Sequence, residues 1–257
     1  MKNVLLSMAA AMAFTVSAHA ETTIVNTGSD SGGFNAVLSM IGENVEHDYV
    51  QAGNPVIAST YFDRKNVLTM WSTEWPGDSK MPNVELNADT IIGLQVYETI
   101  LCSREYTSMD AMRGKDIKIA TWGDSPAVSK FITNLAVELE SKITIVPYDG
   151  SGSTTRGYLG GDADTIFTIQ IRQSKVEADG TCFAFSAEGD LDFAFIDVIL
   201  SVNADDDTVS NLRNIVTKIS GSEAWSTSFE GTKTYIVNGD NAESIVNKTL
   251  AAVDLNS

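Results

Sequence analysis

Three loops rich in glycine and small hydroxyl side chains are the places in this sequence where chemistry could be done. They span residues 27–33 (TGSDSGG), 121–125 (TWGDS) and 148–153 (YDGSGS). Glycine lets a backbone approach a ligand closely, and hydroxyl groups donate or accept hydrogen bonds without burying a charge. Ordinary turns and helix caps use the same residues, so one such loop alone indicates little. Three together favour a binding site.

Catalysis by these loops is less favoured. The surroundings of Ser31 and Ser125 superficially resemble those of a nucleophilic serine, but activating a serine normally requires a positioned base, most often histidine. Beyond residue 20 the only histidine is His47, in a polar stretch, and no Ser-x-x-Lys pattern occurs in the loops. One histidine and two widely spaced cysteines make no recognisable zinc set. We therefore expect no catalytic residue, no metal and no cofactor.

An alternation of strands and helices is expected to position the three loops. Strand-like segments precede all of them, and helical spacing follows the first two: residues 34, 37, 38, 41 and 45 after the first loop, and 128, 131, 132, 135 and 139 after the second. Asp124 or Ser125 is the expected N-cap of the second helix. This rhythm predicts an α/β fold with parallel strands and helical crossovers. Ligands of such sheets bind beyond the carboxyl ends of the strands. The predicted strands cover residues 22–25, 67–71, 90–96, 116–121 and 143–146.

The first 20 residues resemble a secretory signal. Lys2 precedes an apolar run at residues 4–16, and Ala18-His19-Ala20 forms a small-x-small cleavage pattern. The alternative is a buried N-terminal helix. No later segment has 18 consecutive apolar residues, so we expect a soluble protein in the periplasm or otherwise secreted. Removing Lys2 changes the formal net charge from −17 to −18, which disfavours nucleic acid and anionic membrane surfaces as partners.

If the protein is secreted, its two cysteines, Cys102 and Cys182, are in an oxidising compartment. A disulfide and two unrelated buried thiols both remain open, because the sequence does not supply the Cα separation that a bridge needs. The acidic run at residues 205–207 is expected to be a solvated loop, since it lacks the alternating ligand spacing of a calcium site.

The third loop also carries a family resemblance. Residues 146–151 (VPYDGS), followed by residues 159–164 (LGGDAD), resemble the corresponding motif of the tripartite tricarboxylate transporter substrate-binding receptors. The likeness is good over residues 99–167, thinner over 22–38 and weak beyond 184.

The resemblance implies a type II periplasmic binding protein, in which two α/β lobes joined by two crossing strands close over a small ligand. The crossings would lie near residues 99–103 and 181–186. Lobe one would then combine residues 21–102 with 183–257, and lobe two would be residues 103–182. Both cysteines would lie on the crossings, where we hypothesise a disulfide beside the hinge.

The resemblance also implies a ligand set and a role. Backbone N–H groups in the first and second loops would hold a carboxylate, and hydroxyl groups would complete the shell; Tyr148 could equally be a packing residue. Asn35 stands where the family often has aspartate. Asp30, Asp124 and Asp149 would oppose an anionic ligand if they point into the cleft, favouring a neutral or cationic solute. The implied ligand-binding residues are Ser31, Gly32, Gly33, Asn35, Thr121, Ser125, Tyr148 and Ser151.

The implied function is non-enzymatic capture of a small carboxylated metabolite, an organic acid, for uptake by a membrane permease. The alternatives are a secreted serine hydrolase-like enzyme and an envelope protein that keeps the receptor fold as a sensor or structural module.

Overall fold

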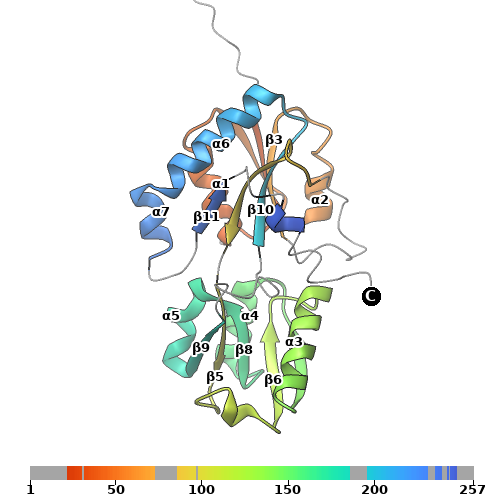
Figure 1. The fold of residues 1–257 in the computed structure, drawn as a ribbon, viewed down its shortest axis with the longest axis vertical. Helices are drawn as coiled ribbons and strands as arrows, with labels where there is room; N and C mark the ends of the chain where they lie inside the picture. Colours follow the sequence, from red (N-terminus) through yellow and green to blue (C-terminus); the bar gives the residue numbers. More distant parts are fainter. Residues whose placement is uncertain are drawn as a thin grey trace, which may run out of the picture.

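The computed structural model describes residues 22–30, 32–72, 86–96, 98–185, 196–230, 235–238, 242 and 244–247. Within these ranges the chain forms two α/β lobes, each built around its own sheet (Figure 1). The expected α/β, two-lobe architecture is therefore confirmed. The predicted signal segment, residues 1–20, lies outside the described residues, as does Ser31. No helix in the described ranges is long and apolar enough to cross a bilayer.

The first lobe contains a six-stranded sheet in the order β11-β4-β10-β3-β1-β2. Helices α1 (Gly33–Gly42) and α6 (Asp206–Ser220) pack together, and their apolar side chains join Ile24 and Leu68 in one buried cluster. The shorter helices are α2 (Pro55–Ser59) and α7 (Glu223–Ser228). The strands are β1 (Thr22–Asn26), β2 (His47–Gln51), β3 (Val67–Ser72), β4 (Ile91–Val96), β10 (Ile196–Val202) and β11 (Tyr235–Asn238).

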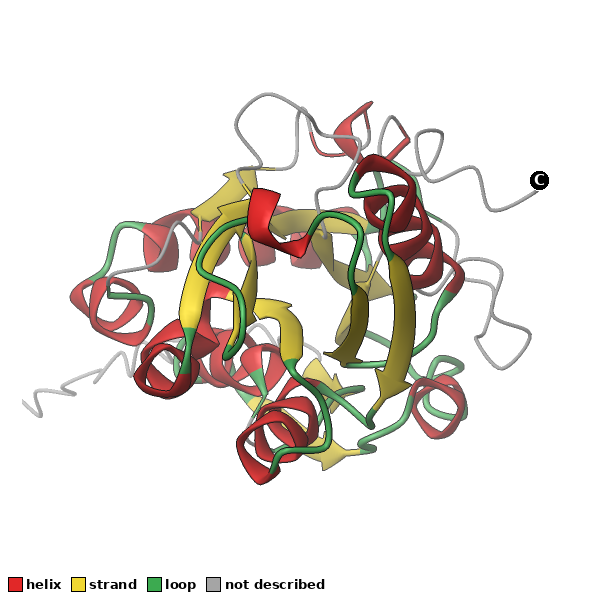
Figure 2. Cartoon of the chain, turned by 90° about the horizontal axis from the view of Figure 1, so that it is seen from below, coloured by secondary structure: helices red, strands yellow, loops and turns green. Residues whose placement is uncertain are grey.

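The second lobe contains a five-stranded sheet in the order β7-β6-β8-β5-β9, with helices on both faces. Helix α3 (Pro126–Glu138) covers one face, where Phe131 stacks on Phe167. Helix α4 (Ser151–Gly160) covers the other, where the ring of Tyr158 is fully buried. Seen from below, the helices lie outside the strands (Figure 2). The remaining elements are β5 (Thr99–Ser103), β6 (Asp116–Thr121), β7 (Lys142–Pro147), β8 (Thr165–Ile169), β9 (Thr181–Phe185), α5 (Gln173–Val176) and the 3₁₀ turns Asp110–Met112, Gln170–Arg172 and Glu177–Asp179.

Both sheets are mixed, whereas the sequence predicted parallel strands. In the first sheet β10 and β11 run against the other strands, and in the second sheet β5 does so. The path of the chain explains the reversal of β5 and β10. Strands β4 and β9 each end on the side of their sheet that faces the other lobe. The next strands, β5 and β10, therefore begin at the side of the other sheet that faces the first one and run away from it.

The expected crossings correspond to β5 and β9, which pair antiparallel within the second sheet. Cys102 and Cys182 are direct register partners there, with Cα atoms 4.0 Å apart, and a disulfide bond joins them. The pairing of β5 with β9 begins at Thr99 opposite Phe185 and continues to Ser103 opposite Thr181. The proposed division of the chain at residues 102 and 182 stays a prediction.

The acidic run at residues 205–207 is not a loop as expected. Asp205 is the N-cap of α6, and its carboxylate accepts a hydrogen bond of 2.8 Å from the N–H of Thr208. Asp206 and Asp207 occupy the first helical turn, where negative charge is favourable.

Candidate functional site

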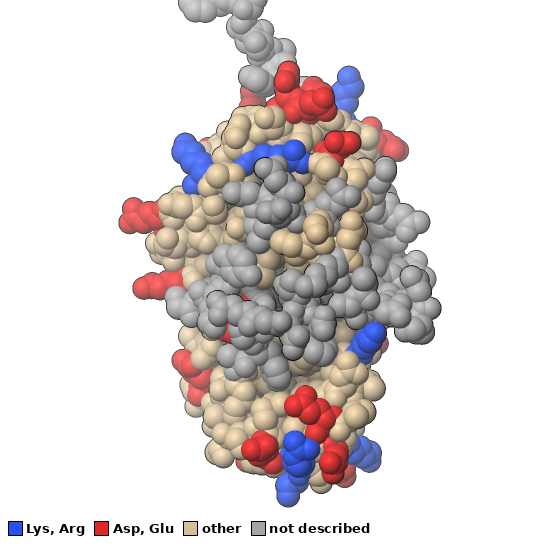
Figure 3. Space-filling model, viewed as in Figure 1, with Lys and Arg blue, Asp and Glu red and all other residues tan. Residues whose placement is uncertain are grey.

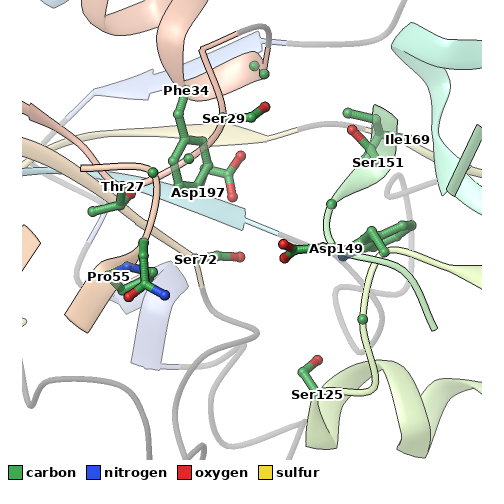
Figure 4. A pocket seen from close by; sticks show the side chains of 18 of the residues that line it. Thr27, Ser29, Phe34, Pro55, Ser72, Ser125, Asp149, Ser151, Ile169 and Asp197 are labelled. Carbon is green, nitrogen blue, oxygen red and sulfur yellow. The ribbon is translucent and has the colours of Figure 1, made fainter. Parts of the chain in front are cut away.

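A cavity of about 590 Å³ lies between the two lobes, and both sheets point strand ends at it (Figure 4). The three loops identified in the sequence all contribute to its wall. The described lining residues are Thr27, Gly28, Ser29, Gly32, Gly33, Phe34, Gly53, Asn54, Pro55, Ser72, Gln95, Trp122, Gly123, Asp124, Ser125, Pro147, Tyr148, Asp149, Gly150, Ser151, Ile169 and Asp197.

The first loop is held by side chains beneath it. Asn26 is fully buried; its amide donates to the side-chain oxygen of Gln51 at 2.8 Å and its Oδ1 accepts from the N–H of Gly28 at 3.0 Å. Gln51 in turn donates to the carbonyl of Gly28 at 2.7 Å. Helix α1 then begins after Gly32 with no side-chain cap. Gly32 and Gly33 at this helix start both line the cavity.

The second and third loops are tied to each other at their bases. The N–H of Tyr148 donates to the carbonyl of Thr121 at 2.9 Å, which joins the ends of β6 and β7. Ser125 caps α3, because its Oγ accepts from the N–H of Val128 at 3.3 Å. Helix α4 begins after Gly150, whose φ of 81° is in the region that favours glycine, and it has no side-chain cap.

Five of the eight residues implied by the family resemblance lie on the cavity wall: Gly32, Gly33, Ser125, Tyr148 and Ser151. Asn35 and Thr121 are not among the lining residues. The Asn35 side chain donates to the carbonyl of Asp30 at 2.6 Å and accepts from the hydroxyl of Tyr49 at 2.5 Å. Thr121 is buried and donates to the carbonyl of Gly123 at 2.5 Å, so it shapes the second loop. Ser31 lies outside the described residues, and ligand binding by the set stays a prediction.

Tyr148 combines a place on the wall with a packing role. Its hydroxyl donates to Oδ2 of Asp162 at 2.7 Å, and this hydrogen bond raises the pKa of the tyrosine. Its ring lies against Gly157 of α4. These contacts with Asp162 and Gly157 support the alternative that Tyr148 is a packing residue.

Sequence reasoning missed a polar row on the floor of the first lobe. Asp197 on β10 is the register partner of Ser72 on β3 and of Gln95 on β4, and all three line the cavity. Asp197 is the only charge in an apolar stretch (FAFIDVILSV, residues 193–202). Burying a carboxylate costs free energy unless it forms hydrogen bonds, pairs with a charge or contacts a ligand. A single aspartate in an apolar stretch is therefore the sequence signal that could have identified Asp197.

Arg172 was also missed. Its guanidinium donates to the hydroxyl of Ser151 at 3.5 Å, close to the start of α4, and its Nε has no hydrogen-bond partner among the described residues. Burial lowers the pKa of this arginine. Arg156, the arginine nearest to the loops in sequence, is exposed and donates to Ser153 at 2.9 Å.

The sequence matches no protein-family model and no curated protein. Solved structures do match. The TctC solute-binding protein from Polaromonas has 11% identity and a TM-score of 0.61, over 91% of this chain and 97% of that one. MatC from Rhodopseudomonas palustris, with bound malate, has 13% identity and a TM-score of 0.64, over 91% and 98%.

A second R. palustris protein, solved with adipate, has 13% identity and a TM-score of 0.66, over 91% of this chain and 95% of that one. The likeness inferred from the third loop is thus confirmed at the level of the fold. The chain has the two-lobe fold of the periplasmic solute-binding proteins.

Proposed function

We propose that this protein is an extracytoplasmic solute-binding receptor, which captures a small carboxylate-bearing metabolite and delivers it to a membrane permease. One observation carries the proposal: the cavity is lined by strand ends and loops from both lobes. A ligand that touches both walls stabilises the closed arrangement over the open one. Closure is then the signal that a permease can recognise.

The second lobe offers a favourable place for a carboxylate. Helix α4 begins at the cavity without a side-chain cap, and unpaired N–H groups at a helix N-terminus attract anions. Arg172 adds a positive charge beside Ser151 at the same helix start. The malate and adipate in the structural neighbours support a carboxylate-bearing solute.

A serine hydrolase has less support. Ser29 and Ser125 line the cavity, but no histidine or lysine is among the described lining residues. His47 lies on β2 with its Nδ1 3.0 Å from the carbonyl of Val45. The hydroxyl of Ser125 caps its own helix instead of meeting a base. We therefore propose a non-enzymatic protein, secreted through the signal-like segment at residues 1–20.

Thermal shift and calorimetry with a panel of small organic acids, including malate, adipate and succinate, test this proposal. We expect at least one acid to raise the melting temperature by mass action. Small-angle scattering should show a smaller radius of gyration in the presence of that acid. Labelling of Ser31 or Ser125 by a fluorophosphonate, without any acid binding, would instead support the hydrolase.

A further inference from the structure

The floor of the first lobe carries a row of three polar side chains on neighbouring strands. Asp197 on the central strand β10 is flanked by Ser72 on β3 and by Gln95 on β4. Direct register partners point to the same face of a sheet with Cβ atoms about 4.5–5.5 Å apart. All three side chains line the cavity, although each is largely buried: Ser72 is 4% exposed, Asp197 6% and Gln95 1%. The row is therefore a compact group of oxygen atoms at the bottom of the site.

Gln95 indicates that this row meets a ligand. Its Oε1 is buried and has no hydrogen-bond partner in the described part of the chain. A buried amide oxygen without a donor destabilises the folded protein, so such groups are rare unless a bound molecule satisfies them. A ligand that reaches this oxygen from the cavity must offer it a hydrogen-bond donor.

The charge of the cavity indicates what kind of donor this is. The lining residues that the structure describes include Asp124, Asp149 and Asp197 but no lysine, arginine or histidine. Asp124 and Asp149 are exposed, whereas Asp197 is buried, so its charge is the least screened by water. In Figure 4 the carboxylates of Asp197 and Asp149 extend from opposite lobes into the space between them. No group of three or more potential metal ligands occurs among the described residues.

We propose that Ser72, Asp197 and Gln95 form a binding subsite for an ammonium group, and that the solute therefore carries an amine as well as a carboxylate. An ammonium group has three N–H donors, and the three side chains of the row carry four oxygen acceptors. Its positive charge is attracted by the buried carboxylate of Asp197. The carboxylate of the same solute then faces the start of α4 on the opposite wall, where Arg172 lies behind Ser151. This inference rests on the proposed receptor function and adds the substrate class.

Matched ligands test the subsite. Binding is measured by calorimetry with adipate, 6-aminohexanoate and 1,6-diaminohexane, which share a six-carbon chain, and with glutarate and L-glutamate, which differ by an α-amine. We expect an amine-bearing carboxylate to bind at least 10-fold more tightly than its amine-free counterpart. If dicarboxylates bind and the amine-bearing ligands do not, the subsite is wrong and the receptor function stands. If none of the five binds, both are contradicted.

Two variants assign the effect to the row. Asp197→Asn should weaken the amine-bearing ligand about 10- to 100-fold, as expected for loss of a charged hydrogen-bond partner, and should leave dicarboxylate binding unchanged or tighter. Gln95→Met, which keeps the volume, should weaken the same ligand about 3- to 10-fold. Asp63→Asn, on an exposed turn of the same lobe, is the matched control and should change neither.

A purely structural role for Asp197 would weaken both ligand classes together, and that result would overturn the proposal. Retained amine binding in a folded Asp197→Asn protein would overturn it as well. If Asp197→Asn does not fold, Gln95→Met decides: an unchanged preference for the amine contradicts the subsite.

Discussion

At the scale of single residues, Gly157 fixes the ring of Tyr148 on the cavity wall. A Cβ added at Gly157 would lie 2.1 Å from Cζ of Tyr148, so the ring would have to move. We expect Gly157→Ala to lower the free energy of unfolding by about 1–3 kcal/mol, as overpacking does. Gly160→Ala in the same helix meets no atom within 4 Å and should be neutral or stabilising by up to about 1 kcal/mol. Urea unfolding measures both, and equal values for the two variants would contradict the close contact.

Tyr158 supplies a prediction about pH. Its ring is fully buried and its hydroxyl has no hydrogen-bond partner among the described residues. Burial raises the pKa of this tyrosine, so its folded-state pKa exceeds the unfolded value near 10. Its contribution to stability is therefore complete below about pH 10 and is lost as the pH rises through the folded-state pKa.

We expect Tyr158→Phe to be as stable as the parent at pH 7, or more stable by up to about 1 kcal/mol, because it removes an unsatisfied hydroxyl. The variant should also lose less free energy of unfolding between pH 9 and pH 11 than the parent does. Urea unfolding across that range is the measurement. A variant that loses more than about 1 kcal/mol at pH 7 would mean that the hydroxyl is hydrogen-bonded.

At the scale of elements, the disulfide joins β5 to β9, two strands that are 80 residues apart at the bridge. We expect a Cys102→Ala/Cys182→Ala protein to be less stable by about 2–4 kcal/mol, because the bridge restricts the unfolded chain. Mass spectrometry of the parent should show a gain of two hydrogens upon reduction. Reductant should destabilise the parent and leave the double variant unchanged; free thiols in non-reduced protein would contradict the bridge.

The strongest local patterns predicted their elements well. The β6 strand has the expected bounds, and α3 begins at the expected cap, because Ser125 and Pro126 fix its first turn locally. Strand direction could not be predicted in this way. An apolar stretch such as residues 193–202 favours a buried strand in either direction, and only the path between the lobes determines that β10 runs against β3 and β4.

At the scale of the whole molecule, a formal net charge of −17 predicts a response to salt. On the face in Figure 3 carboxylates lie at both ends of the molecule and along its left side. The ion pair between Arg104 and Asp179 is partly exposed and 3.3 Å long, so screening it costs little. Repulsion among the excess carboxylates therefore dominates, and salt weakens it beyond a Debye length of about 8 Å at 0.15 M.

We expect the melting temperature to rise by several degrees between 10 and 200 mM sodium chloride, at about 2–4 °C for each kcal/mol gained in a chain of this size. Differential scanning calorimetry is the measurement, with glucose at equal osmolality as the control. A melting temperature that falls with salt would mean that attractive ion pairs outweigh the repulsion.

The sequence by itself determined the α/β class, the three loops at the cavity and the family likeness of the third loop, because these depend on local spacing and on turn and cap chemistry. The family resemblance also suggested a disulfide between the two cysteines, although the sequence did not supply the Cα separation that a bridge needs. Only the tertiary structure decided that Cys102 meets Cys182, that Asn35 and Thr121 support loops instead of lining the cavity, and that Arg172 reaches Ser151.

The row of Ser72, Gln95 and Asp197 belongs to the same class of facts. These three residues are up to 125 positions apart (197 − 72 = 125), and only Asp197 stands out in its own segment. Strand pairing brings them onto one face, because register across a sheet is set by long-range packing and by the route of the chain between the lobes. The charge of the site therefore follows from the fold as a whole.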